Sequence, residues 1–287
     1  MNYSEIIAGT MSWGSWGKQL SQKEMISLMH HCLEVKINTF DHADIYGAYT
    51  TEEQFGAAFA NSGIDRETIQ LISKCGIQYV CDKRDNKVKH YNYNKDYIIW
   101  SAEQSLQHLQ TEYLDLLLLH RPSPLMHPNE IAEAVTILKD QGKIKQFGVS
   151  NFTPSQLELL SLRIDIDVNQ IEFSLTEHSA MHDGTLDYMI GCGIKPMAWS
   201  PLGEVFKTNN EQTKRIMAQL EDLQDKYDAS LDQLLLAWIL KHPSKIQPVI
   251  GTTTKERMTN AVKATHIDLE LEDWFLILVA AQGHKVP

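Results

Sequence analysis

Four ionisable residues follow short apolar runs in the first half of the chain, and their types suit proton transfer: Asp41, Tyr46, Lys74 and His120. A tyrosine hydroxyl titrates near about 10, so alone it is a poor acid–base catalyst at neutral pH. A neighbouring ammonium lowers that pKa, and a partly buried ammonium needs a carboxylate of its own. A histidine beside them can hydrogen-bond a substrate oxygen. Together these groups would make a proton-donating oxyanion site next to a hydride donor.

Each of the four also has a purely structural interpretation. Asp41 can cap a helix or pair with an arginine, and Tyr46 can serve packing alone. Lys74 can reach solvent, and His120 can be a loop histidine that bonds to the backbone. Their occurrence together at or just past successive strand ends favours the catalytic interpretation, because active sites of α/β barrels lie at the carboxyl ends of the strands.

Short β-like runs alternate with helical patterns from one end of the chain to the other. The predicted strands are 6–10, 38–41, 70–74, 114–120, 144–149, 168–172, 195–199 and 248–251. The run 114–119 is nearly all apolar, as a strand covered on both faces should be.

Helices are predicted between these strands, and several begin at a capping box, in which a Ser or Thr and a residue three positions later cap each other. Such boxes are Ser21–Glu24, Thr153–Gln156, Ser230–Gln233 and Thr253–Glu256, and the stretches 25–33, 96–110, 129–141 and 212–227 have helical patterns. Pro154 would occupy the first helical position of its helix.

Eight strand–helix alternations predict an α/β fold, a closed (βα)8 or TIM barrel, with a doubly wound sheet as the alternative. No Pro/Gly-rich linker and no sequence repeat divides the chain, so we expect one domain over 1–287. The least regular stretch, 76–94, is too long for an idle barrel loop and is a candidate lid.

The composition excludes several classes of protein. The chain has 287 residues, 43% apolar and 22% charged, and its net charge of −11 argues against nucleic-acid binding. The start of the sequence shows no signal peptide, and no apolar run is long enough to span a membrane. Cys32, Cys75, Cys81 and Cys192 form no disulfide pattern, so we expect a reduced, cytoplasmic setting.

Eight segments, in order and spacing, resemble those of the aldo/keto reductases over nearly the whole chain. They are GTMSWG (9–14), FDHADIYG (40–47), ISKCG (72–76), LDLLLLHRP (114–122), GKIKQFGVSNF (142–152), NQIEFS (169–174), AWSPLG (198–203) and VIGTTTKERM (249–258). The chain most resembles a bacterial, short-looped branch of that family, commonly described only as predicted oxidoreductases.

The resemblance implies a catalytic tetrad of Asp41, Tyr46, Lys74 and His120. Tyr46 would be the general acid in reduction of a carbonyl and the base in oxidation of an alcohol. Lys74, paired with Asp41, would lower the pKa of Tyr46, and His120 would orient the carbonyl. The implied partners are a small carbonyl substrate and NADP(H), in a protein that is a monomer or a weak oligomer.

The resemblance also implies a set of cofactor-binding residues. Ser150, Asn151 and Gln170 would hold the nicotinamide carboxamide, and Trp199 would stack on the ring. The other implied contacts are Ser200, Leu202 and Gly203 along the pyrophosphate, Gly251, Thr252, Thr253 and Arg257 around the adenosine 2′-phosphate, and Thr10 and Met11 from the first strand.

The adenine side departs from the family pattern. Gly251 and Thr252 stand where the family often has a Lys-Ser pair, and Ala261 replaces a usual Asn, with Asn260 one position early. A helix starting at 253 would still offer free N–H groups to a phosphate, and the Arg257 guanidinium could bind it bidentately. Alternatively, Arg257 pairs with a surface acid such as Glu256 or Glu270.

Two other functions fit parts of the sequence. Asp41, His42, Asp44 and His120 could ligate a metal in a hydrolase, although no H-x-H ends the first strand and no carboxylate ends the eighth. A barrel that binds NADPH and signals redox state as a regulatory subunit is the second. Rossmann and P-loop motifs are incomplete, because 191–196 lacks the third glycine and 142–143 lacks the upstream one.

A few further residues remain open between two interpretations. Cys75, next to Lys74, is either a low-pKa thiol or a small core residue. Trp13, Trp16, Trp100 and Tyr79 either line a substrate pocket or serve packing.

Overall fold

The computed structural model describes residues 3–287, and in these residues eight parallel strands close into a barrel. They are β1 (Ile7–Gly9), β2 (Thr39–Asp41), β3 (Gln70–Cys75), β6 (Leu114–Leu119), β7 (Ile144–Ser150), β8 (Val168–Glu172), β9 (Lys195–Trp199) and β10 (Gln247–Ile250). β1 pairs with β10 on one side and with β2 on the other, so no edge remains. The predicted (βα)8 TIM barrel is confirmed, and the doubly wound alternative is wrong.

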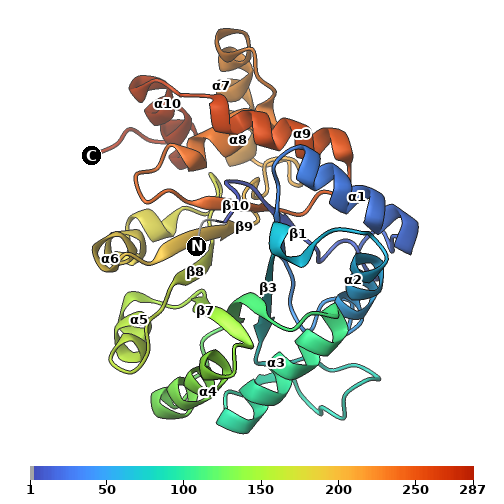
Figure 1. Cartoon of the computed structure of the whole chain (residues 1–287). Coiled ribbons are helices and arrows are strands. Elements are labelled where there is room, and N and C mark those ends of the chain that lie inside the picture. Colours follow the sequence, from blue (N-terminus) through green and yellow to red (C-terminus); the bar gives the residue numbers. More distant parts are fainter. Residues whose placement is uncertain (1–2) are drawn as a thin grey trace.

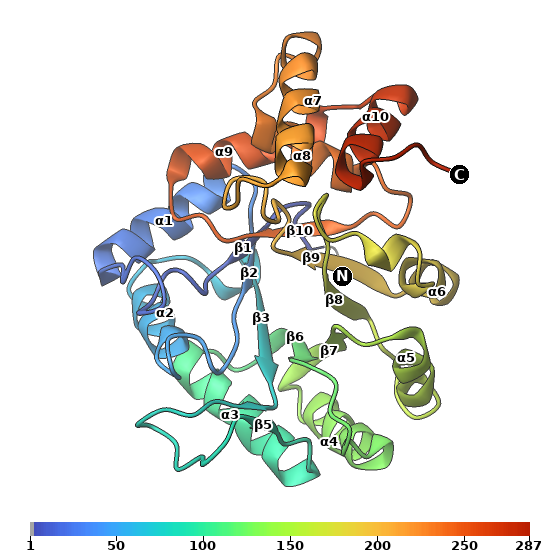
Figure 2. The same ribbon diagram turned by 180° about the vertical axis from the view of Figure 1, so that it is seen from behind.

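Helices surround the barrel on all sides (Figures 1 and 2). They are α1 (Gln22–Glu34), α2 (Thr51–Ala60), α3 (Lys95–Leu109), α4 (Pro128–Asp140), α5 (Pro154–Ser161), α6 (Thr185–Cys192), α7 (Glu211–Tyr227), α8 (Leu231–Leu240), α9 (Lys255–Lys263) and α10 (Leu271–Gln282). The 3-10 turns η1 (Arg66–Thr68), η2 (Ser179–Met181) and η3 (Ala264–His266) complete the connections.

Strand β6 shows why its sequence is almost wholly apolar. Leu116 and Leu118 point into the barrel, where they join Ile72, Val168 and residues of other strands. Leu117 and Leu119 point outward and pack against the helical shell. All six residues of β6 are buried, because the strand is covered on both faces.

The predicted helix starts are confirmed at three boxes and wrong at one. Reciprocal capping boxes are formed by Ser21 with Glu24, by Thr153 with Gln156 and by Ser230 with Gln233, and Pro154 is the first residue of α5. At α9, however, the cap residue is Thr254, which makes no side-chain cap bond. The Thr252 hydroxyl instead accepts from the Thr254 N–H at 3.1 Å, so the helix starts one residue later than predicted.

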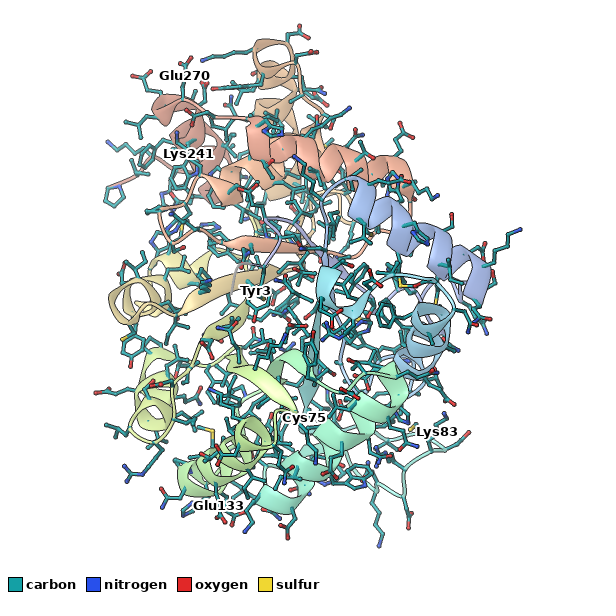
Figure 3. The ribbon with its side chains drawn as sticks, in the orientation of Figure 1. Tyr3, Cys75, Lys83, Glu133, Lys241 and Glu270 are labelled. Atoms are coloured by element: carbon teal, nitrogen blue, oxygen red, sulfur yellow. The ribbon has the colours of Figure 1, made fainter. Side chains whose placement is uncertain are left out.

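The segment 76–94 is ordered by a short hairpin of β4 (Ile77–Gln78) and β5 (His90–Tyr91). It leaves the barrel at Gly76, whose φ is 110° and where a Cβ atom would lie 2.0 Å from the Tyr93 ring, so only glycine fits. The Arg84 guanidinium fixes the loop by stacking on the rings of Tyr49 and Trp100, at 4.4 and 4.6 Å. Lys83 lies on the projecting part of this loop, whereas Cys75 lies inside (Figure 3).

None of the helices in residues 3–287 is long and apolar enough to cross a membrane.

Candidate active site

Three neighbouring strands carry three of the four predicted catalytic residues to the same end of the barrel. Asp41 ends β2, Lys74 lies one residue before the end of β3, and His120 directly follows β6. The strands are hydrogen-bonded in the order β2, β3, β6, so their carboxyl ends are adjacent. Tyr46 lies in the turn after β2, where its N–H donates to the Ala43 carbonyl at 3.1 Å.

Lys74 is the centre of this group. Its ammonium donates to Asp41 Oδ2 at 2.7 Å, to the His42 carbonyl at 2.8 Å and to Tyr46 Oη at 3.0 Å. The lysine side chain is fully buried together with Asp41. A buried ammonium needs such partners, because its charge has lost the hydration of bulk water. The arrangement therefore fixes a cation against a phenol oxygen at the mouth of the barrel.

The sequence predicts a lowered pKa for Tyr46, whereas the structure raises it. Burial raises the pKa of Tyr46 above its ordinary value, and the Lys74 cation offsets only part of that increase. Burial alone would lower the pKa of Lys74, but Asp41 and Tyr46 together raise it. Tyr46 is thus a protonated phenol beside an ammonium, which is the state that a general acid requires.

His120 is held as a neutral imidazole. Burial, followed by the nearby cations Lys74, Arg121 and Lys89, lowers the pKa of His120 well below its ordinary value. Its ring lies edge-on to Tyr46, with 6.1 Å between the ring centroids. Its Nδ1 is buried and has no hydrogen-bond partner among the described residues, and such an atom is costly unless a ligand satisfies it.

The residues expected to hold a nicotinamide form one hydrogen-bonded group next to the tetrad. The Ser150 hydroxyl donates to the Gln170 carbonyl at 2.8 Å, and the Trp199 indole N–H donates to Asn151 Oδ1 at 3.1 Å. Gln170 Nε2 also donates to Asp41 Oδ1 at 2.9 Å, which links this group to the catalytic one. Amide and hydroxyl groups gathered in this way offer both donors and acceptors, as a carboxamide needs.

The turn after β9 contains the residues expected along a pyrophosphate. Ser200 has a φ of 52° and Gly203 a φ of 53°, so the backbone is left-handed at both positions. A Cβ atom at Gly203 would lie 2.1 Å from Thr176 Oγ1, so glycine is required for close packing on the loop after β8. Leu202 is partly buried and packs on the core.

The residues expected around the 2′-phosphate lie at the end of β10 and the start of α9. Gly251, Thr252 and Thr253 precede the helix, and Arg257 is exposed in its first turn. No ion pair in residues 3–287 includes Arg257, and Glu270 pairs instead with Lys226 at 2.9 Å. The alternative in which Arg257 forms an ion pair with Glu270 is therefore wrong.

The two cofactor residues expected from the first strand differ in their surroundings. Thr10 is fully buried, and its hydroxyl donates to the Asp41 carbonyl at 3.0 Å and lies 2.9 Å from His42 Nδ1. Met11 is half exposed. Thr10 therefore supports the backbone of the tetrad, and Met11 is the one open to the surface.

The four aromatic residues that the sequence left open separate into two kinds. The Trp16 ring lies tilted to Tyr46 and edge-on to Tyr79, with ring centroids 6.3 and 5.3 Å apart, so Trp16 and Tyr79 form an aromatic wall beside the Tyr46 phenol. Trp13 is fully buried against Phe40 and serves packing. Trp100 lies under Arg84 of the 76–94 loop. The sequence alone could not bring Tyr79 to Trp16, because the pair depends on how the hairpin folds back.

Two other interpretations are not supported by the geometry. Burial raises the pKa of the Cys75 thiol well above its ordinary value, so Cys75 is a buried core residue and not a reactive thiolate. In residues 3–287, no three His, Cys, Asp or Glu side chains are grouped to hold a metal ion. Asp41 binds Lys74 instead, and His42 binds Thr10.

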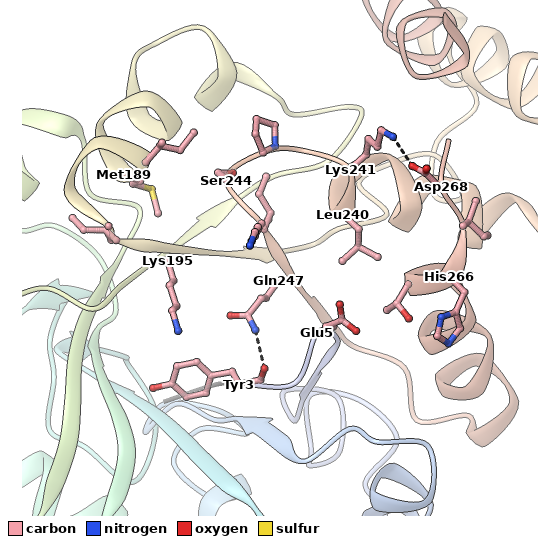
Figure 4. A pocket seen from close by; sticks show the side chains of 18 residues that line it. Tyr3, Glu5, Met189, Lys195, Leu240, Lys241, Ser244, Gln247, His266 and Asp268 are labelled. Atoms are coloured by element: carbon pink, nitrogen blue, oxygen red, sulfur yellow. Dashed lines mark hydrogen bonds and ion pairs between the residues drawn. The ribbon is translucent and has the colours of Figure 1, made fainter. Parts of the chain in front are cut away.

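A cavity of about 870 Å³ lies at the opposite end of the barrel, where β9 and β10 begin (Figure 4). Its lining includes Tyr3, Lys195 and Gln247, and none of the tetrad. Gln247 points into this space and donates to the Tyr3 carbonyl at 3.1 Å. This cavity is therefore separate from the candidate active site, which lies at the carboxyl ends of the strands.

Comparison with known proteins shows the family to which the chain belongs. The sequence model of the aldo/keto reductase family matches residues 5–277, and the chain belongs to that family of oxidoreductases. It is 43% identical to the uncharacterized oxidoreductase YcsN of Bacillus subtilis, over 100% of this chain and 97% of that protein. It is 36% identical to a 6-dehydroglucose reductase of Agrobacterium fabrum, over 89% of this chain and 86% of that one.

A solved structure shows the same architecture. The thermostable aldo-keto reductase Tm1743, determined in complex with the inhibitor epalrestat, superposes with a TM-score of 0.82. The two are 26% identical, over 96% of this chain and 94% of the other. Members of this family generally bind a nicotinamide cofactor. The regulatory-subunit alternative has no support among these relatives, whose names are those of oxidoreductases or reductases.

Proposed function

We propose that this protein is an NADP(H)-dependent reductase of aldehydes or ketones that also oxidises the corresponding alcohols. The observation that carries the proposal is the contact of Lys74 Nζ with both Tyr46 Oη at 3.0 Å and Asp41 Oδ2 at 2.7 Å, at the carboxyl end of the barrel. A phenol, an ammonium and a neutral imidazole together suit a carbonyl oxygen that gains negative charge and then a proton.

In this mechanism Tyr46 donates its hydroxyl proton to the carbonyl oxygen during reduction. The Lys74 ammonium stabilises the phenolate that remains, and Asp41 holds the ammonium in place. The neutral His120 donates a hydrogen bond that orients the carbonyl, since its lowered pKa leaves one ring N–H. In alcohol oxidation the same phenolate oxygen takes the proton back.

A nicotinamide cofactor fits the residues beside the tetrad and would supply the hydride. Asn151, Gln170 and Ser150 offer the donors and acceptors of a carboxamide site, and the indole face of Trp199 would pack on the ring. Thr252, Thr253 and Arg257 at the start of α9 would hold the 2′-phosphate of NADP(H), because a helix N-terminus and a guanidinium both favour an anion.

The relatives support a carbonyl substrate. The Agrobacterium relative is named as a reductase of 6-dehydroglucose. The wall of Trp16 and Tyr79 next to Tyr46 provides a packing face for the body of a small organic molecule.

The proposal is tested by Tyr46→Phe, which removes one hydroxyl and keeps the ring. Turnover of a panel of aldehydes and ketones, followed at the nicotinamide absorbance, should fall by about 10² to 10⁴, the usual contribution of a general acid. NADPH binding, followed by quenching of protein fluorescence, should persist. Tyr188→Phe on α6 is the matched control. Retention of more than half of the wild-type kcat, with chemistry rate-limiting, would refute the assignment.

A further inference from the structure

Arg121 was not among the residues singled out by sequence, yet it lies within the candidate active site. It follows His120 directly and is partly buried. Its Nη1 donates to Ser150 Oγ at 3.1 Å, and its guanidinium carbon lies 5.1 Å from the centre of the Trp199 ring. The side chain therefore extends from the end of β6 over β7 to β9, across the mouth of the barrel.

The guanidinium of Arg121 has no carboxylate of its own. No ion pair in the described part of the chain includes it. Both of its side-chain hydrogen bonds come from Nη1, one to Ser150 and one to the His120 carbonyl at 3.2 Å. Two further nitrogens, Nη2 and Nε, are left as donors for a ligand, and a planar guanidinium suits a carboxylate in particular.

The position of Arg121 is fixed by its backbone. The Arg121 N–H donates to the Tyr93 hydroxyl at 3.1 Å, and the same hydroxyl donates to the Arg121 carbonyl. Tyr93 is itself buried and packs on Gly76 at the start of the 76–94 loop. An anchored residue next to His120 suits recognition of a ligand, because less freedom is lost on binding.

Cations lie near His120, although the chain as a whole carries a net charge of −11. Lys74, Arg121 and Lys89 are the charged groups that lower the pKa of His120. Asp41 pairs with Lys74, whereas the exposed Glu172 acts on Arg121 only from beyond ion-pair distance. Arg121 therefore remains an unpaired cation beside His120, and such a cation favours an anionic ligand.

We infer that Arg121 is a specificity residue that binds the carboxylate of an anionic carbonyl substrate, an aldehyde or ketone that also carries an acid group. The inference rests on the proposed function. The carbonyl lies at Tyr46 and His120, the acid group at the free nitrogens of Arg121, and the body of the substrate against Trp16. The cofactor phosphates are expected elsewhere, in the turn after β9 and at α9, so they do not account for this cation.

The first test compares two aldehydes of similar size and different charge, 4-carboxybenzaldehyde and 4-formylbenzamide, by kcat/KM with NADPH. The wild-type protein should prefer the acid by about 10- to 100-fold, the range expected of a charge-assisted hydrogen bond. Arg121→Gln should bring the ratio close to one, and Arg121→Lys should restore part of it. Arg163→Gln, which removes the same charge at the other end of the barrel, should leave the ratio as in the wild type.

The second test needs no turnover and separates this inference from the proposed function. Calorimetric titration with benzoate and with benzamide measures the anion site directly. Benzoate should bind more tightly to the wild type, and the difference should disappear in Arg121→Gln. If benzoate binding depends on Arg121 but the protein reduces neither aldehyde, the anion site is supported and the proposed reductase activity is refuted. Reduction of both aldehydes at a ratio unchanged by Arg121→Gln, or equal binding of benzoate and benzamide by the wild type, overturns the inference.

Discussion

At the scale of single residues, the Lys74 ammonium joins three groups of the candidate site. It touches a carboxylate, a backbone carbonyl and a phenol oxygen within 3.0 Å. Two effects on the pKa of Tyr46 oppose each other, because burial raises this pKa and Lys74 lowers it. The balance between these two effects decides the pH range over which Tyr46 can donate its proton.

Lys74→Met therefore shifts the pH dependence of reduction. Tyr46 must be protonated to act as the acid, so the rate falls as pH rises through its pKa. Removing the cation leaves burial unopposed, so the pKa of Tyr46 rises further and the alkaline limb moves to higher pH. The kcat/KM of alcohol oxidation should also fall, since the phenolate form of Tyr46 loses its counterion. An alkaline limb at the wild-type position would contradict the role of Lys74.

The residue types and spacing in the sequence were enough to predict that Asp41, Lys74 and His120 lie at the same end of the barrel, because each is at or just past the end of a strand. The net direction of the Tyr46 pKa was not readable, since it depends on how completely the phenol is buried. Arg121 was missed for a related reason. Its neighbours Ser150 and Trp199 come from later strands, and only the closed barrel brings them within reach.

At the scale of elements, the strands were predictable because burial on both faces leaves a nearly continuous apolar run, as in β6. The start of α9 was not, because the Thr252 hydroxyl bonds to the Thr254 N–H and no capping box forms at Thr253. The hairpin of β4 and β5 was also missed. Its strands have two residues each, which is too short for any periodicity to appear.

Helix α9 carries a prediction about the coenzyme. Arg257 is exposed in its first turn, at the end that bears the positive partial charge. Arg257→Ala should raise the Kd for NADPH by about 10- to 100-fold, the equivalent of a contact of about 1.5–3 kcal/mol. NADH should be nearly unaffected, since it lacks the 2′-phosphate. Fluorescence quenching measures both, and Lys263→Ala in the last turn of α9 is the control. Equal weakening of the two coenzymes would show that Arg257 does not recognise the phosphate.

At the scale of the whole molecule, the closed barrel buries a histidine that cannot be protonated without cost. Burial and the Lys74 cation lower the pKa of His42 to about 3. In the unfolded chain His42 titrates near about 6.5, so between these values the unfolded state binds the extra proton. The stability that a neutral His42 permits is complete above pH 6.5 and is lost as pH falls toward 3. His120 acts in the same direction.

Acid conditions should therefore lower the free energy of unfolding. From pH 7 to 5, His42 alone should account for about 2 kcal/mol. Asp44 opposes this trend, because burial raises its pKa well above the ordinary value. The measurement therefore compares two proteins. Urea unfolding gives the free energy of unfolding at pH 7 and at pH 5, for the wild type and for His42→Asn. The variant should lose about 2 kcal/mol less on acidification, with exposed His266→Gln behaving as the wild type. Parallel losses in His42→Asn and wild type would contradict the prediction.

The pairing of β1 with β10 also has a consequence for how the chain is made. Residues 7–9 emerge from the ribosome long before their partners at 247–250, which come more than two hundred residues later. Until then β1 and β9 are open edges, and such edges pair readily with other chains. The tetrad, complete at residue 120, thus exists on the nascent chain well before the sheet that protects it can close. A ribosome stalled before residue 247 would release a product prone to aggregation, whereas the finished barrel has no edge left to offer.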